Sequence, residues 1–290
     1  MSGSRGLVLG GRLGRTGPPS ELGRRLRRLA RADQGVLIAL VVLLLISFVG
    51  PLLVGVNPEE PVGRPFTPPF GQFFLGTDEL GHDIWSRILY GARQSWIGAF
   101  IVVSSGIVIG TAVGLIAGAT RGWVDSVLMR VTDVFLALPG PVLALAIAAA
   151  LGRSYANTLI AVAIVWWPLY ARIVRSEVRA FSSRPYIEAA KLSGVSASRR
   201  LIRHLLPGTL PVIIIAGSLD VGGLILTVSG LSFLGLGAAQ PAPELGAMVA
   251  QGIPYILSSN WIALFPAIAI FLIALVCNLA GDALRDLLEE

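Results

Sequence analysis

Six long apolar stretches, separated by charged segments, constrain this sequence more than any other feature. A helix that crosses a bilayer needs about 20 mostly apolar residues. The stretches meet this requirement, and we expect membrane spans at about residues 35–55, 95–119, 132–152, 156–173, 208–231 and 261–280. Only 14% of the residues are charged, whereas a soluble domain carries about 25%. The sequence therefore predicts an all-α fold, a polytopic membrane protein with six transmembrane helices.

The distribution of basic residues predicts the orientation of these spans. Lys and Arg concentrate in cytoplasmic loops close to the ends of spans. If the N-terminus is cytoplasmic, 19 of the 23 basic residues fall on the cytoplasmic side, and the other four are Arg64, Arg87, Arg93 and Arg153. We therefore expect both termini inside the cell. No aromatic or fold signal accompanies the basic N-terminus, so the sequence predicts no nucleic-acid partner.

The chain divides near residue 33. Residues 1–33 are rich in basic residues and begin with a Gly-, Ser- and Pro-rich stretch, which predicts a basic cytoplasmic arm that is partly disordered. Residues 34–290 form the predicted membrane domain, and a long basic cytoplasmic loop occupies about residues 174–207. The first span lacks a small-residue cleavage site, so we interpret it as an uncleaved anchor rather than a signal peptide.

The residues that usually carry out catalysis are scarce. Cys277 is the single cysteine, and the two histidines, His82 and His204, fall on opposite predicted sides of the membrane. A phosphate-binding Gly-x-x-x-x-Gly-Lys-Ser/Thr sequence is absent, and Lys191 is the only lysine. We therefore predict no catalytic residue, no metal site and no cofactor bound by this chain. A passage or a scaffold fits this composition better than an enzyme.

Span two carries a glycine every four residues, at Gly106, Gly110, Gly114 and Gly118. On a helix these glycines share one face, which lets a second helix approach closely. We expect this face to pack either within the chain or against a subunit partner. Pro139 and Pro141 fall inside span three, and we expect them to kink it.

Asp220 is the only charged residue that lies away from the ends of an expected span. An acid near the middle of the membrane indicates function by default. Two interpretations stay open here. Asp220 either lines a translocation path or ties two helices together through a hydrogen bond, and its neighbours Gly217, Gly222 and Gly223 favour the tie.

The basic loop contains a recognisable motif. Its residues are Glu188, Ala189, Ala190, Lys191, Gly194, Leu206 and Pro207. Their spacing resembles the EAA loop of the membrane subunits of ABC importers, with His204 where that family has Ile. From the residues we expect a helix from Pro185 to Leu192 that stops at Gly194, and a second helix, capped by Ser196, that ends before Pro207. The resemblance implies that this loop docks on an ATPase subunit.

Two further blocks narrow the resemblance. Residues 75–95, which begin Leu-Gly-Thr-Asp and end Gly-Ala-Arg-Gln-Ser, and residues 231–246 resemble the dipeptide/oligopeptide/nickel permeases. We expect Asp83 to cap a short helix, to lie one turn from Arg87, and Gly91 to end this helix before span two. We interpret this segment as an interfacial helix, and surface location alone explains it better than contact with a substrate.

The resemblance implies one permease subunit of a type I ABC importer in the bacterial cytoplasmic (inner) membrane, carrying di- or oligopeptides. It implies a second homologous permease subunit, two ATP-binding subunits or domains that use ATP and Mg, an extracytoplasmic substrate-binding protein, and membrane lipid. A nickel or glutathione importer of the same family is the alternative within this class. Two interpretations from other classes stay open: a secondary transporter or channel that works without ATP, and a membrane scaffold. A single intramembrane acid offers few groups for relaying ions, which weakens the first of them.

Overall fold

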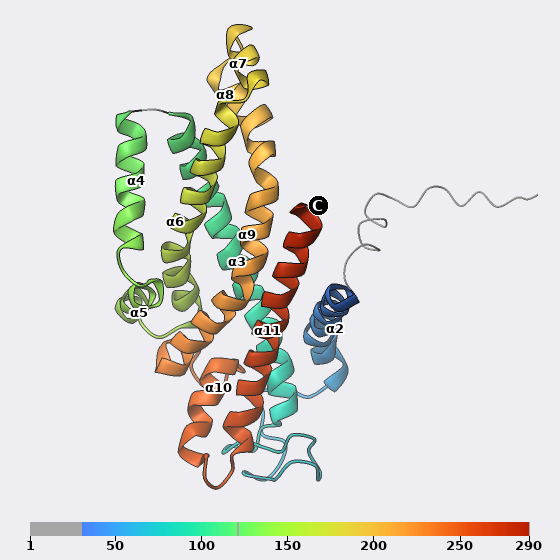
Figure 1. Cartoon of the computed structure of the whole chain (residues 1–290). Helices are drawn as coiled ribbons and strands as arrows, with labels where there is room; N and C mark the ends of the chain where they lie inside the picture. The colour runs from blue at the N-terminus through green and yellow to red at the C-terminus, as the bar shows by residue number, and fades with distance from the viewer. Residues whose placement is uncertain (1–30, 121, 290) are drawn as a thin grey trace, which may run out of the picture.

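The computed structural model describes residues 31–120 and 122–289, and all regular elements in this part of the chain are helices (Figure 1). The predicted arm, residues 1–33, lies almost entirely outside the described residues. The helices are α2 (Arg31–Val54), α3 (Ile84–Ala119), α4 (Trp123–Leu136), α5 (Gly140–Leu151), α6 (Tyr155–Ser182), α7 (Pro185–Leu192), α8 (Ala197–Arg200), α9 (Leu206–Leu231), α10 (Leu245–Gly252) and α11 (Trp261–Glu289). Short π-helical turns at Leu201–Leu205 and Ser232–Leu236 flank α9, and a 3₁₀ turn, Ile253–Tyr255, follows α10.

The all-α prediction is confirmed. Within the described ranges, five segments built around α2, α3, α6, α9 and α11 are long and apolar enough to cross a membrane. A sixth crossing exists only if α4 and α5, which meet at an angle of 85°, are counted as one broken span.

The kink expected at Pro139 in span three is confirmed, but it is a full break: α4 and α5 meet there at an angle of 85°, and α4 already begins at Trp123. Pro139 adopts a non-helical ψ of 120° and precedes the first residue of α5. Its carbonyl accepts the backbone N–H groups of Val142 and Leu143, at 3.0 and 3.1 Å, which starts a new helix in a new direction. A proline also disfavours the helical conformation of the residue before it, here Leu138.

The glycine face of α3 lies against α6 of the same chain. A Cβ at Gly110 would lie 2.6 Å from the carbonyl oxygen of Trp167 and 2.9 Å from the nitrogen of Ala171. A Cβ at Gly114 would meet the carbonyl oxygen of Ala171 at 2.6 Å. Gly106 faces the ring of Tyr170, and Gly118 faces Val178. The stripe therefore serves packing within the chain.

Gly110→Ala is expected to destabilise the fold by about 1–3 kcal/mol, the range for overpacking a tight contact. The added methyl group would meet backbone atoms of α6, which cannot rotate away. Gly223→Ala is the matched control, because no atom lies within 4 Å of a Cβ at that helical position. Thermal unfolding of both variants in the same detergent checks this. Equal melting temperatures would contradict the packing of α3 on α6.

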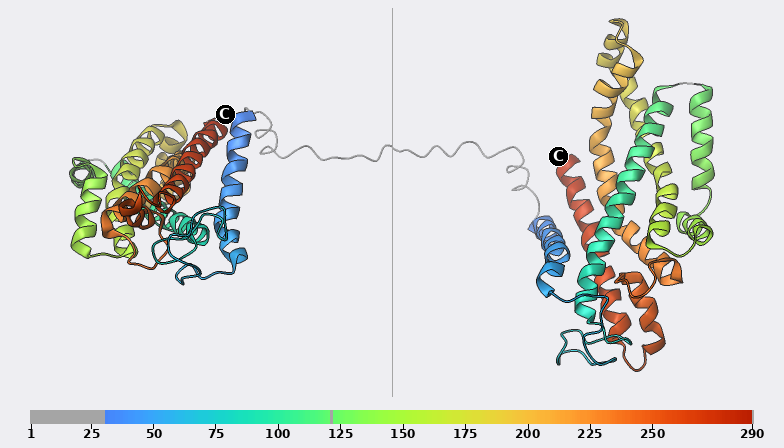
Figure 2. Two further views of the ribbon diagram at one scale, coloured as in Figure 1. Left: turned by 90° about the horizontal axis from the view of Figure 1, so that it is seen from below. Right: turned by 180° about the vertical axis from the view of Figure 1, so that it is seen from behind.

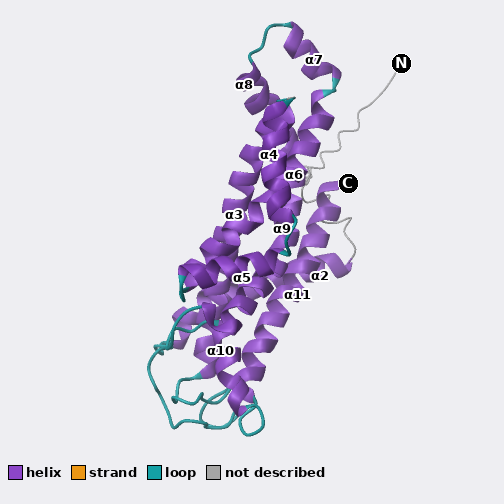
Figure 3. Cartoon of the chain, turned by 90° about the vertical axis from the view of Figure 1, so that its left-hand side faces the viewer, coloured by secondary structure: helices purple, strands orange, loops and turns teal. Residues whose placement is uncertain are grey.

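The two ends of the bundle differ. The elbow formed by α7 and α8 extends beyond one end, while α10 and the loop between α2 and α3 gather at the other (Figures 1 and 3). The last turns of α11 point toward the end that carries the elbow (Figure 1). Helix α2 lies at one edge of the bundle beside α11 (Figure 2) and exposes apolar side chains, including Leu52 and Leu53.

Candidate functional site

The turn between α7 and α8 depends on a single glycine. Gly194 has a φ of +74°, a conformation that side-chain-bearing residues rarely adopt. The backbone N–H of Val195 donates to the carbonyl of Ala190 at 3.1 Å, closing the end of α7 in the way that C-terminal glycines allow. A Cβ at Gly194 would have no atom within 4 Å, so the glycine is needed for backbone conformation and not for space.

One side chain anchors this elbow to the bundle. Ile187 is the buried residue of α7, and it packs with Val174 and Val178 of α6 and with Leu205 before α9. The remaining surface is open: Tyr186 is 47% exposed and Leu192 is 89% exposed. An apolar, exposed helix held by one anchor at the end of two long helices is suited to contact with another protein.

The motif residues divide between the elbow and the next long helix. Glu188, Ala189, Lys191 and Gly194 are exposed on the elbow, and Ala190 is half-buried. Leu206 and Pro207 instead form the first turn of α9. The prediction that a second elbow helix ends before Pro207 was wrong. The chain continues from α8 through the π-helical turn Leu201–Leu205 into α9, and a proline in a first turn breaks no helical hydrogen bond.

Ser196 precedes α8 as predicted, but its hydroxyl makes no capping hydrogen bond to the helix. The hydroxyl lies 3.5 Å from the hydroxyl oxygen of Ser198. The short helix is held instead by Arg200, whose guanidinium donates to the carbonyl of Val195 at 2.5 Å.

Ion pairs between one buried carboxylate and two partly exposed arginines attach α4 to α6 near the elbow. The Asp125 carboxylate, 7% exposed, accepts from Nε and Nη2 of Arg175 at 2.5 and 2.9 Å, and from Arg179 at 2.5 Å. A bidentate guanidinium–carboxylate pair is strong and directional. The first turn of α4 is therefore attached to the segment of α6 that leads into the elbow. The sequence alone does not indicate this pairing, because it joins residues 50 positions apart.

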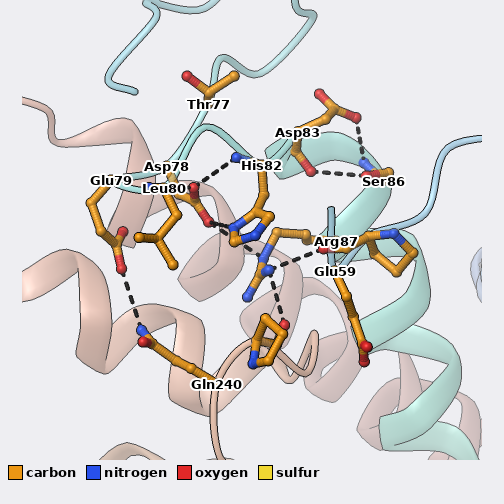
Figure 4. Close-up of polar contacts among 12 residues, drawn as sticks. Glu59, Thr77, Asp78, Glu79, Leu80, His82, Asp83, Ser86, Arg87 and Gln240 are labelled. Atoms are coloured by element: carbon orange, nitrogen blue, oxygen red, sulfur yellow. Dashed lines mark hydrogen bonds and ion pairs between the residues drawn. The ribbon is translucent and has the colours of Figure 1, made fainter. Parts of the chain in front are cut away.

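At the opposite end, Arg87 joins three segments (Figure 4). Its side chain is 2% exposed, and Nη1 donates to the carbonyls of Pro58 and Pro241, both at 3.0 Å. Its Nε lies 3.7 Å from the Asp78 carboxylate, which also contacts Nδ1 of His82 at 2.7 Å. Arg87 therefore holds α3, the segment after α2 and the segment before α10 together.

The cap expected in this region is confirmed, but two other expectations need correction. Asp83 caps α3 as predicted, through the N–H of Ser86 at 2.8 Å, but it does not pair with Arg87, which faces Asp78. Gly91 does not end a short helix, because α3 runs on to Ala119. Its missing side chain instead allows close packing: a Cβ there would lie 3.3 Å from the backbone nitrogen of Leu245.

Two carboxyl groups at this end are shielded from water, Glu244 fully and Glu79 in part. Burial raises the pKa of the Glu79 carboxyl, which accepts a hydrogen bond from Gln240 at 3.3 Å. Burial also raises the pKa of Glu244, although hydrogen bonds, including one from the N–H of Ala238 at 2.8 Å, act in the opposite direction. The burial of Glu244 and the hydrogen bonds of both carboxyls fit a folded cap rather than a loose loop.

Asp220 is half-buried on α9 and accepts a hydrogen bond from the indole Nε1 of Trp166 on α6 at 3.2 Å. This contact fits the interpretation of a tie between helices. A role in the translocation path stays a prediction. Asp220 is not the only ionisable residue in a spanning helix, because α3 starts at Ile84 and includes Arg87 and Arg93.

Comparison with known proteins agrees with this arrangement. Residues 110–290 match the family described as binding-protein-dependent transport system inner membrane component. The chain is 41% identical, over 87% of its length and 84% of the relative's, to the dipeptide transport system permease protein DppC of Alkalihalophilus pseudofirmus. It is 41% identical to the glutathione transport system permease protein GsiD of Pectobacterium atrosepticum, over 91% and 89% of the two chains.

The family and the relatives consist of transport permease subunits and not of enzymes. The resemblance found in the EAA motif and in the two flanking blocks is therefore confirmed. Several apolar helices agree with a multi-pass location in the inner membrane. The chain belongs to the family of binding-protein-dependent transport system inner membrane components.

Proposed function

We propose that this chain is one permease half of a type I ABC importer that carries di- or oligopeptides across the cytoplasmic membrane. The names of its relatives support short peptides as the solute class, since glutathione is itself a tripeptide. A glutathione importer is the second candidate for that reason. The nickel alternative has no counterpart among the relatives named above.

The family implies an ATPase and a substrate-binding protein as partners. For this chain we infer two ATP-binding subunits or domains, a second homologous permease subunit and an extracytoplasmic binding protein. ATP and Mg would be bound by the ATPase subunits and not by this chain. The orientation that suits these partners places both termini and the α7–α8 elbow in the cytoplasm, on the side with 19 of the 23 basic residues.

The projecting elbow is the observation that carries this proposal. Its outer face is exposed, and it continues into α9 with no intervening loop. Ile187 attaches it to α6 as well. A push on the elbow would therefore move α6 and α9 directly, and these helices are joined near the middle of α9 by Trp166 and Asp220. In the proposed transporter, this chain couples ATP hydrolysis to transport by passing the movement of the elbow to α6 and α9.

A photo-crosslinking amino acid at position 192 is expected to attach to an ATPase subunit in the intact transporter. Leu192 is 89% exposed on the elbow, which makes it a direct probe of the docking surface. Leu257 is the matched control, because it is 100% exposed and lies beyond α10 at the opposite end. Mass spectrometry of the crosslinked band identifies the partner. Attachment of the ATPase at position 257, or at neither position, would contradict the proposed docking.

A further inference from the structure

Arg93 is a cation inside a spanning helix that the rest of the described chain leaves unpaired. Its Nε is buried and has no hydrogen-bond partner, and none of the ion pairs between described residues includes it. The position of Arg93 along α2 follows from the contacts of two neighbouring residues on α3. Leu89 packs against Gly50, and Trp96 donates to the hydroxyl of Ser47 at 3.2 Å.

These contacts place Arg93 well inside the end of α2 at Val54. Gly50 is four residues from that end, which corresponds to about 6 Å along a helix. An arginine within a spanning segment is unfavourable unless it faces a partner or a water-filled cavity, and such residues mark solute pathways. Arg93 lines such a cavity, and it has no ion-pair partner among the residues that the structure describes.

The cavity has a volume of about 630 Å³, within the size range of small-molecule sites. Arg93 and Gln94 line it from α3, while Asn57 and Glu59 line it from the segment after α2. Two tyrosines form further walls, but their hydroxyls are already used: Tyr90 donates to the carbonyl of Pro51 at 3.3 Å and Tyr155 to that of Gln94 at 2.9 Å. The groups left for a ligand are one cation, one carboxylate and the Gln94 amide.

The segment of the cavity wall that carries Glu59 is held in place by the hydrogen bonds of Arg87. The carbonyl of Pro58, the residue before Glu59, accepts a hydrogen bond from Arg87. The carbonyl of Pro241, two residues before the lining residue Pro243, also accepts a hydrogen bond from Arg87. The Glu59 side chain is exposed, and its carboxylate belongs to no ion pair in the ranges that the structure covers. The cavity wall is therefore held in place, and its lining includes a half-buried cation, Arg93, and an exposed carboxylate, Glu59.

We propose that this cavity is an entry site for a zwitterionic solute, whose carboxylate binds Arg93 while its ammonium group faces Glu59. The proposal rests on the proposed transport function and narrows its substrate class to solutes with a free carboxylate. A guanidinium binds a carboxylate through two parallel hydrogen bonds, and this geometry selects it over a neutral amide. Arg93 is here a specificity-determining residue for entry.

Protection of a cysteine from labelling tests the site in the complete transporter embedded in nanodiscs. Cys277 is the only native cysteine and is buried, so Val56→Cys introduces one reactive thiol in the cavity wall. Val62→Cys, in the same loop but outside the cavity, is the matched control. The probes are the dipeptide Ala-Ala and its C-terminal amide, which keeps the ammonium group and lacks the carboxylate.

Ala-Ala is expected to slow the labelling of Val56→Cys by a membrane-impermeant maleimide in a saturable way. The amide is expected to need about tenfold higher concentration, since a hydrogen-bonded charge of this kind contributes about one to two factors of ten in affinity. Adding Arg93→Gln should remove the difference between the two probes, and Arg93→Lys should keep part of it. Labelling of Val62→Cys should not change.

Equal protection by both probes, or protection that survives Arg93→Gln, would overturn the proposal. Protection by the substrate-binding protein without peptide would also overturn it, because the carboxylate would then come from that protein. Uptake of Ala-Ala is measured in the same preparation. Uptake without protection rejects the entry site alone, whereas protection without uptake leaves the site and rejects the transport of this peptide.

Discussion

Replacing Gly194 with proline is expected to reduce uptake by at least about tenfold while the protein still inserts into the membrane. Gly194 has a φ of +74°, and proline is confined to a φ near −65°. Forcing a residue out of its required backbone region involves about 1–3 kcal/mol, and 1.4 kcal/mol corresponds to a factor of ten. The elbow would therefore change direction between α7 and α8, and its exposed face would no longer match the ATPase.

Gly194→Asn is the control for this experiment, because asparagine tolerates the left-handed conformation better than other side chains do. A Cβ at position 194 has open space around it, so neither side chain meets a steric obstacle. Asparagine keeps the backbone N–H that Gly194 donates to the carbonyl of Lys191 at 3.1 Å, whereas proline removes it. Uptake and membrane abundance are measured together. Normal uptake by Gly194→Pro, or equal loss in both variants, would contradict a role for the elbow geometry. Glu188→Arg should also reduce uptake, by reversing a charge on the same exposed face.

Arg87→Leu is expected to destabilise the protein by about 3–5 kcal/mol, the range for removing one member of a buried ion pair. The change leaves the Asp78 carboxylate without its guanidinium and leaves the carbonyls of Pro58 and Pro241 without this donor. Thermal unfolding in detergent gives the effect. Arg64→Leu is the control, since Arg64 is an exposed arginine in the loop that leads from α2 to α3.

A double variant separates the ion pair from the two backbone contacts. Asp78→Asn added to Arg87→Leu should destabilise by less than the sum of the single changes, because the uncompensated charge is removed. Additive effects would show that the carbonyl contacts, rather than the 3.7 Å ion pair, hold this end together. Equal stability of Arg87→Leu and Arg64→Leu would contradict the structural role of Arg87.

Hydropathy predicted five of the six spanning segments in the right order, because long apolar stretches leave few alternatives in a membrane protein. The remaining segment, at residues 132–152, is broken between α4 and α5. Hydropathy placed the start of span two about ten residues late. Arg87 and Arg93 lower the local hydropathy, yet both lie inside α3, where one is buried among carbonyls and the other faces a cavity. The cap at Asp83 was the available signal that a helix starts at Ile84.

Proline and glycine positions were harder to interpret. Pro139 predicted a disturbance in span three, but the 85° angle between α4 and α5 depends on tertiary packing, including the pairing of Asp125 with α6. Pro207 ends helices in one context and starts them in another, and here it starts α9. The glycine stripe predicted a close helix partner, but nothing in its spacing identifies α6 as that partner.

Measuring which energy source drives uptake tests most directly whether this chain belongs to an ATP-driven importer. Membrane vesicles that contain the complete transporter are supplied with its binding protein outside and labelled Ala-Ala, with ATP or a non-hydrolysable analogue inside. An ionophore mixture abolishes the proton and sodium gradients. Uptake is expected to require ATP hydrolysis and to persist without the gradients. Uptake that continues with the analogue and stops with the ionophores would contradict this expectation, and would identify a secondary transporter.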